Sequence, residues 1–317
     1  MKRLLALGVV LVIGCEVEVP EYKPVGKGMN LTQITSEKGM NILPDISSDG
    51  KWLCFSSNRR GNFDLFIKKP EEQTVIQRTF GRESDLFPSW SIDGQKLAFS
   101  SNRFGSFDIF VIDAFSGQDT RQITSDSSDE IAPDWSPDGK KIVFTKIRRG
   151  DETSYSIVIV DCQTGLETEL TDGLFPKFSP DGEKICFQRG IEEGKQSIWI
   201  INRDGSMETE VVYSPTFSAV TPSWSSDGER LIYASAVIGE GDGDKEGLIP
   251  ELVAYQPIDL KVIKIDGSND TQITGDSGPD GFPTWSADYI IYFCSIRSSI
   301  QNEGNIDIFR MKLESLP

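Results

Sequence analysis

The chain has 317 residues, of which 38% are hydrophobic and 26% charged, as in an ordinary soluble globular protein. Its 49 acidic residues outnumber the 32 basic ones, and the formal net charge of −17 argues against a nucleic-acid partner, because neutralising phosphates requires clustered lysine and arginine. The chain contains no histidine, which excludes serine–histidine catalysis, cysteine–histidine catalysis and histidine-ligated zinc within it.

The first element is a predicted signal peptide at residues 1–14. A basic start over residues 1–3 precedes an apolar run that is too short to span a bilayer. The run ends in a Val-Ile-Gly-Cys tetrapeptide that resembles a bacterial lipobox, so we expect Cys15 to be acylated and to become the new N-terminus. Residues 15–30, which have prolines and glutamates but no apolar periodicity, would form a lipidated tether. The alternatives are an ordinary signal peptide or an uncleaved anchor.

From residue 31 a short motif recurs six times: a proline, an aromatic or apolar residue two positions later, and an Asp-Gly turn, except that the sixth copy lacks the glycine after Asp288. The copy from Pro133 to Gly139 predicts a β-hairpin, because glycine tolerates positive φ and aspartate bonds back to its own turn. Successive prolines are 44, 45, 43, 46 and 61 residues apart; they are Pro44, Pro88, Pro133, Pro176, Pro222 and Pro283. A period near 44 built from short strands is typical of propeller blades.

The order of the strands predicts how the ring closes. Each repeat contains four strand-like runs, of which the proline strand is innermost and a threonine-rich run is last. One such run, Thr32–Thr35, precedes the first proline, whereas the chain ends just after the third strand of the sixth repeat, near Leu313. We therefore predict an all-β fold over residues 31–317: a six-bladed β-propeller of four-stranded antiparallel blades, closed by the N-terminal strand.

The 61-residue interval reflects a predicted insertion in blade five, residues 236–259. Within it, Asp242, Asp244 and Glu246 match positions 1, 3 and 5 of an EF-hand-like calcium loop. Position 12 is Val253, so the bidentate glutamate is missing. These three residues are the candidate ligands for Ca²⁺, and no other cofactor is expected. The alternative is a mobile glycine-rich acidic loop that binds no metal.

The residue three positions before each proline should lie at one mouth of the central channel. The candidate binding residues at this mouth, counting one neighbour, are Asn41, Asp85, Asp129, Glu130 and Asp280. Converging carboxylates could bind a cation or a basic segment of a partner, and could perturb one another's pKa values. The alternative is a solvated acidic rim without function.

Two of the cysteines occupy equivalent positions in the second strands of opposite blades. Cys54 and Cys186 would be too far apart to form a disulfide, so we expect both to be small buried hydrophobic residues.

Phrases such as Trp135-Ser136-Pro137-Asp138-Gly139 and Ser100-Ser101-Asn102-Arg103 resemble the TolB-type, WD40-like propeller repeats, and the resemblance covers about residues 31–313. It implies a six-bladed propeller. TolB itself has an additional N-terminal α/β domain and is a soluble periplasmic protein, whereas this chain has a signal peptide and a tether in that place.

We therefore expect a monomeric, lipid-anchored protein of the bacterial cell envelope that binds an envelope protein or peptide and the membrane, but no nucleic acid. The alternative is a carbohydrate-processing or carbohydrate-binding envelope protein that uses the acidic channel mouth, because related propellers form carbohydrate-lyase cores. We favour binding over catalysis, since the chain has no histidine and no Gly-x-Ser-x-Gly nucleophile elbow. A carboxylate-only glycosidase is the enzymatic form that the composition still allows.

Overall fold

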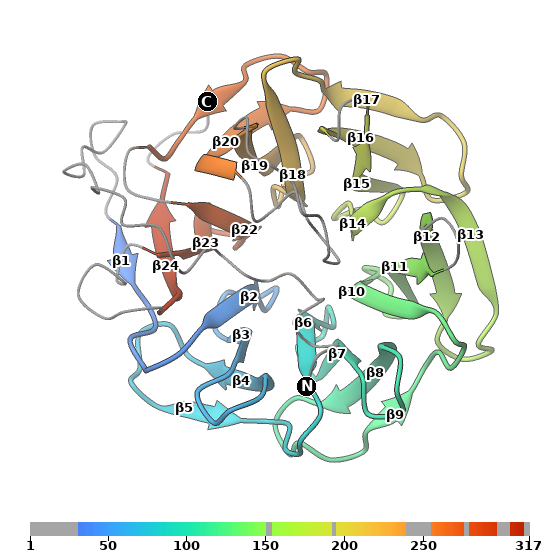
Figure 1. Ribbon diagram of the computed structural model, residues 1–317, viewed down its shortest axis with the longest axis vertical. Coiled ribbons are helices and arrows are strands. Elements are labelled where there is room, and N and C mark those ends of the chain that lie inside the picture. The colour runs from blue at the N-terminus through green and yellow to red at the C-terminus, as the bar shows by residue number, and fades with distance from the viewer. Residues whose placement is uncertain are drawn as a thin grey trace.

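The computed structural model describes residues 31–149, 154–191, 195–238, 255–275, 279–296 and 305–313. In these ranges the regular elements are 24 β-strands, which form six four-stranded antiparallel sheets around a central axis (Figure 1). The predicted six-bladed β-propeller is confirmed. No helix in the described ranges is long and apolar enough to cross a membrane.

In the first five blades the strands follow one another from the channel outward, in chain order (Figure 1). Blade one contains β2 (Asn41–Ile46), β3 (Leu53–Ser57), β4 (Asp64–Lys68) and β5 (Val75–Gln77). Blade two contains β6 (Asp85–Trp90), β7 (Lys96–Ser101), β8 (Asp108–Asp113) and β9 (Arg121–Gln122). Blade three contains β10 (Asp129–Trp135), β11 (Lys141–Arg148), β12 (Ser154–Asp161) and β13 (Glu167–Asp172).

The second half of the ring has the same order, except that its last strand comes from the other end of the chain. Blade four contains β14 (Leu174–Phe178), β15 (Lys184–Gly190), β16 (Gln196–Asn202) and β17 (Thr209–Val212). Blade five contains β18 (Phe217–Trp224), β19 (Arg230–Ile238), β20 (Tyr255–Lys264) and β21 (Thr271–Gln272). Blade six contains β22 (Asp280–Trp285), β23 (Ile290–Ser295), β24 (Asp307–Lys312) and β1 (Thr32–Gln33).

The turn between the first two strands explains why the motif repeats so strictly. In the third copy the Ser136 hydroxyl donates to the Asp138 carboxylate at 2.6 Å, and the same carboxylate accepts the backbone N–H of Lys140 at 3.0 Å. Gly139 has a φ of 68°, which a glycine adopts without strain. Serine and aspartate thus bridge the turn, and glycine supplies the left-handed backbone that aims the second strand back along the first.

The hydrophobic core lies between blades. Trp90 of blade two packs against Cys54, Leu65 and Ile67 of blade one, and the equivalent tryptophans of blades three, five and six pack in the same way. Cys54 and Cys186 are fully buried free thiols in such clusters, as expected. The two faces of each sheet are therefore buried against the neighbouring blades.

Blade five differs from the prediction in its bounds. Strands β19 and β20 extend into the predicted insertion, because Ser235 pairs with Asp259 and Ile238 pairs with Tyr255. The segment between the strands is therefore shorter than residues 236–259. Residues 239–254, which include the candidate calcium ligands, lie outside the described residues, as do residues 1–30.

The ring closes as predicted. Strand β1 pairs with β24, with Thr32 opposite Arg310 and Gln33 opposite Phe309. Next to it, the buried Ile34 donates its N–H to the carbonyl of Ile308 at 2.7 Å. The N-terminal strand thus covers the outer edge that β24 would otherwise expose.

Removing the closing strand should destabilise the whole ring. A chain that starts at residue 37 would lose the buried Ile34 and leave the outer edge of β24 unpaired, so we expect its thermal midpoint to fall by about 10 °C. Circular dichroism melting curves measure this, with a chain that starts at residue 31 as the control. Identical midpoints for the two chains would contradict closure by β1.

Candidate functional site

The predicted mouth residues do lie together at one end of the channel, where the innermost strands begin. Asn41, Asp85 and Asp280 are the first residues of β2, β6 and β22, and Asp129 and Glu130 begin β10. Their burial was not anticipated, since Asn41, Glu130 and Asp280 are 0% exposed and Asp85 is 2% exposed. Most of this set therefore faces the interior of the blades, and only Asp129 is half-buried.

In blades one and two, an arginine just after the second strand forms a hydrogen bond or an ion pair with the mouth residue of the same blade. Arg103 forms an ion pair with Asp85 at 3.2 Å while its guanidinium stacks over Phe110, 4.5 Å from the ring centroid. The same arrangement joins Arg59 to Asn41 through a hydrogen bond of 2.8 Å. The Asn-Arg sequence that follows the second strand in blades one and two thus supports blade structure.

A lysine ammonium occupies the one acidic cluster in the described ranges with metal-ligand spacing. The carboxylate oxygens of Asp126, Glu130 and Glu167 lie within 4.8 Å of one another. Lys146 Nζ lies 2.5 Å from Asp126, 2.6 Å from Glu167 and 3.1 Å from Glu130. Burial raises the pKa of Glu130 to about 7, although Lys146 opposes the shift. The cluster thus holds an internal cation.

Two further acids lie at this end of the blades, at the starts of the third strands. Burial raises the pKa of Asp64 to about 6, and the nearby Asp85 contributes. Burial likewise raises the pKa of Asp108 to about 6, with a contribution from Asp126. Acids that hold protons near neutral pH make the stability of this fold pH-dependent.

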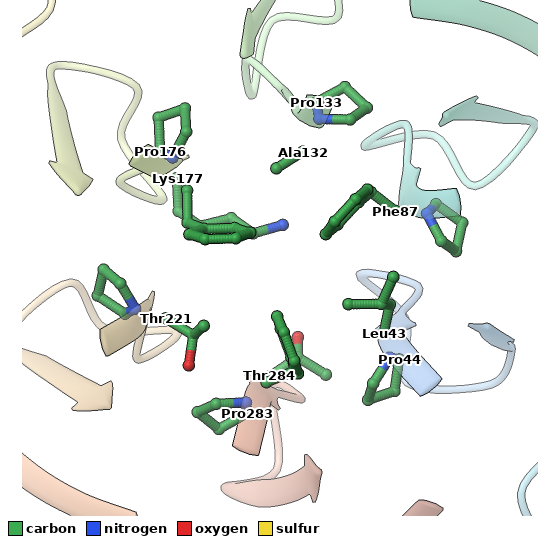
Figure 2. Close-up of a pocket in the computed structure, with 14 residues that line it drawn as sticks. Leu43, Pro44, Phe87, Ala132, Pro133, Pro176, Lys177, Thr221, Pro283 and Thr284 are labelled. Atoms are coloured by element: carbon green, nitrogen blue, oxygen red, sulfur yellow. The ribbon is translucent and has the colours of Figure 1, made fainter. Parts of the chain in front are cut away.

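Deeper in the channel, six apolar or weakly polar side chains form a layer that we call the apolar tier. Each is the residue immediately before the repeated proline, and together they surround a small cavity on the channel axis (Figure 2). The ring of Phe175 lies 5.9 Å from that of Phe87 and 6.1 Å from that of Phe282, so phenylalanines from alternate blades meet across the channel. The apolar tier consists of Leu43, Phe87, Ala132, Phe175, Thr221 and Phe282.

The apolar tier is backbone-strained. Its six residues have φ values between 50° and 57°, because each innermost strand contains a β-bulge at this point. Side chains of the preceding blade hold the bulge: Phe175 N–H donates to Thr145 Oγ1 at 3.0 Å, and Thr221 N–H donates to Gln188 Oε1 at 2.8 Å. Such non-glycine residues cost about 1–3 kcal/mol each, and strain of this kind concentrates at functional sites.

The residue after each proline forms a second layer, which we call the polar tier. It consists of Asp45, Ser89, Asp134, Lys177, Ser223 and Thr284. Lys177 Nζ donates to Asp134 Oδ1 at 3.0 Å. The Asp45 carboxylate accepts the N–H of Trp90 at 2.8 Å and the hydroxyl of Thr284 at 3.2 Å. An ammonium flanked by two carboxylates therefore lies at the channel axis.

Electrostatics favour the charged lysine. Burial alone would lower the pKa of Lys177, but the carboxylates of Asp134 and Asp45 outweigh it and raise that pKa. Burial raises the pKa of Asp45, and Lys177 opposes part of this shift. Because Lys177 stays protonated, it has no free electron pair and is not a nucleophile at neutral pH.

The polar tier is the floor of an open cavity of about 240 Å³, which we call the cup. Its walls are the repeated aromatic residues, among them Trp90, Trp135, Trp224 and Trp285. Its rim is formed by the residues just before the Asp-Gly pairs: Ser48, Ile92, Pro137, Pro180 and Ser226. The apolar tier narrows the channel directly beneath the floor. The cup can thus receive a group from one side only.

Sequence reasoning placed the candidate site at the opposite mouth and did not identify the cup. A usable signal was present, because the position between the proline and the aromatic residue varies in charge while its neighbours repeat. That position carries aspartate twice, serine twice, lysine once and threonine once. The other candidate residues, Cys15, Asp242, Asp244 and Glu246, lie outside the described residues.

Fold and cup together define a closed six-bladed β-propeller with a one-sided polar pocket on its axis. Residues 27–175 match the family profile described as the TolB beta propeller domain, and the fold agrees over the whole ring. This part of the chain is similar to the TolB-type β-propellers, and the described residues share their fold. None of the curated protein sequences matches it.

Solved structures show the same fold at low sequence identity. A putative TolB from Agrobacterium tumefaciens is 22% identical with a TM-score of 0.64, over 90% of this chain and 98% of that one. TolB from Acinetobacter baumannii is 16% identical with a TM-score of 0.60, over 85% of this chain and 65% of that one. An oligogalacturonate lyase from Vibrio parahaemolyticus is 17% identical with a TM-score of 0.60, over 92% of this chain and 96% of that one.

The buried acids predict that stability rises on mild acidification. Asp64, Asp108 and Glu130 have folded pKa values of about 6, 6 and 7, above the ordinary 3.8, 3.8 and 4.5. Between pH 4 and 7 the folded state therefore binds more protons than the unfolded state, so its free energy of unfolding falls as pH rises. We expect a higher thermal midpoint at pH 5.5 than at pH 7.5.

The double variant Asp64→Asn, Asp108→Asn should reduce this slope, because amides do not titrate. Melting curves over the same pH range measure both proteins. A wild-type midpoint that increases steadily from pH 5.5 to 7.5 would show that these acids are not the dominant titrating groups.

Proposed function

We propose that this protein is a lipid-anchored binding scaffold of the cell envelope that receives a partner protein or peptide in the cup. The observation that carries the proposal is the geometry of the channel, in which a polar floor faces an open mouth and the apolar tier closes off the other side. A pocket of this kind suits binding rather than passage. Its buried charges are already paired with one another, which suits a preformed recognition site.

The predicted N-terminus supports the location. An acylated Cys15 would attach the protein to a membrane, since several acyl chains on one residue bind far more firmly than one. A fully extended tether of residues 16–29 would reach on the order of 50 Å, which is enough to hold the propeller clear of the lipid head groups.

A carbohydrate-binding or carbohydrate-processing role is the second candidate. It is supported by the fold likeness to oligogalacturonate lyases, one of them in complex with manganese. The floor of the cup also combines carboxylates, hydroxyls and an ammonium, groups that can hydrogen-bond sugar hydroxyls. Incubation with oligogalacturonate separates the candidates: formation of unsaturated product would favour the lyase, and an unchanged substrate would favour the scaffold.

Site-specific photo-cross-linking in the native host tests where a partner binds. A photoreactive residue at Ser226, on the exposed rim of the cup, should give discrete adducts. The same residue at Thr168, on the outer strand β13, is the matched control and should give none. A third position, Glu83, lies beside the predicted mouth residues. Adducts at Glu83 but not at Ser226 would move the site to the opposite mouth.

Lipidation can be tested separately. The variant Cys15→Ala should not incorporate labelled fatty acid and should move from the membrane fraction to the soluble fraction, because it lacks the acceptor thiol. Cys162→Ala is the control, since Cys162 is a half-buried thiol in the propeller and should leave labelling unchanged. Equal labelling of both variants would contradict acylation at Cys15.

A further inference from the structure

The acceptors of the polar tier are largely engaged by the protein. The Asp134 carboxylate accepts the ammonium of Lys177 at 3.0 Å, the N–H of Phe178 at 2.8 Å and the hydroxyl of Ser89 at 3.4 Å. Asp45 accepts one backbone N–H and one hydroxyl. These contacts fix both carboxylates against the wall of the channel.

The hydrogen-bond donors of the polar tier, in contrast, can still bind a ligand. The hydrogen bond to Asp134 uses one of the three N–H groups of Lys177, whose side chain is 30% exposed and extends toward the channel axis (Figure 2). On the adjacent blade, the Ser223 hydroxyl lines the cup and has no hydrogen-bond partner among the described residues. The floor of the cup therefore offers an ammonium and a hydroxyl from adjacent blades.

The shape of the cup limits what can reach these donors. Its volume of about 240 Å³ is small, and the apolar tier prevents a chain from passing through. Indole rings, the half-buried ring of Pro137 and the exposed ring of Pro180 line the entrance of the cup. A chain end that carries an acceptor, with an apolar side chain beside it, fits both the floor and the walls.

We propose that the cup binds the C-terminal carboxylate of a peptide or protein whose last residue is apolar, through Lys177 and Ser223. The proposal deepens the proposed scaffold function and rests on it. A carboxylate suits the site because it accepts charge-assisted hydrogen bonds from an ammonium and a hydroxyl together. Asp45 and Asp134 repel a phosphate dianion more strongly than a carboxylate monoanion, and Lys177 repels a second ammonium.

Three short peptides test the chemistry by isothermal titration calorimetry on the intact protein. They are acetyl-Gly-Gly-Leu as the free acid, the same peptide as the C-terminal amide, and acetyl-Gly-Glu-Gly amide, in which the only carboxylate is on a side chain. We expect the free acid to bind at least tenfold more tightly than either amide. Equal affinity of the free acid and its amide would overturn the proposal.

Substitutions in the polar tier test which of its residues bind the carboxylate. Ser223→Ala should weaken binding of the free acid by about two- to tenfold, the effect of one lost hydrogen bond. Asp45→Asn should strengthen it by about threefold, because it removes a negative charge near the bound carboxylate. Thr168→Ala, on the outer strand β13, should leave it unchanged. Lys177→Met should abolish it. Because that variant also leaves Asp134 unpaired, the gain with Asp45→Asn is the decisive result, which a loss of folding cannot mimic.

The remaining outcomes are also informative. Tighter binding of the side-chain carboxylate would overturn the assignment to a chain terminus. If no peptide binds up to millimolar concentration while Ser226 still forms adducts in the host, the carboxylate proposal fails and the scaffold function stands. If Ser226 forms no adducts, the scaffold function fails as well.

Discussion

The structure depends on one constraint: each blade buries the two apolar faces of its sheet against its two neighbours. Trp90 of blade two, for example, completes its burial among Cys54, Leu65 and Ile67 of blade one. A ring with an open joint would therefore expose two such faces together with the edge of a sheet. The pairing of β1 with β24 removes this joint, and the short N-terminal strand thereby stabilises contacts far beyond its own two residue pairs.

Closure also brings the six innermost strands to one axis, where a shared local feature builds the site. A bulge before each proline turns one side chain into the apolar tier, and the residue after the proline forms the polar tier. The strain of six positive φ values is tolerated because the preceding blade hydrogen-bonds the bulge, as Thr145 does for Phe175. The ring thus supplies both the rigidity and the asymmetry that a recognition site needs.

The two ends of the channel use their acids differently. At the end where the inner strands begin, Asp85 and Glu130 are buried and neutralised by Arg103 and Lys146, so their first role is to join strands within a blade. At the other end, Lys177 and its two carboxylates face an open cavity. Acidic residues at a channel mouth are therefore poor guides to function until their partners are known.

The sequence by itself determined the class of fold, the number of blades, the order of strands and the closing strand. These follow from short-range rules that recur from blade to blade: the Asp-Gly turn of Gly139, the aromatic at Trp135 and the alternation of apolar residues. It also indicated that Cys54 and Cys186 are buried. A repeated fold is easier to predict than a unique one, because several copies of the motif independently support the same strand assignment.

Only the tertiary structure decided where the site lies. Whether Glu130 faces solvent depends on Lys146, and whether Lys177 reaches the axis depends on Asp45 from the opposite blade and Asp134 from the adjacent one. Local rules carry no information about such contacts, because the partners come from separate strands or separate blades that meet only when the ring closes. In the sequence the polar tier is only a variable position after each proline. The closed ring brings these six residues together around one cavity.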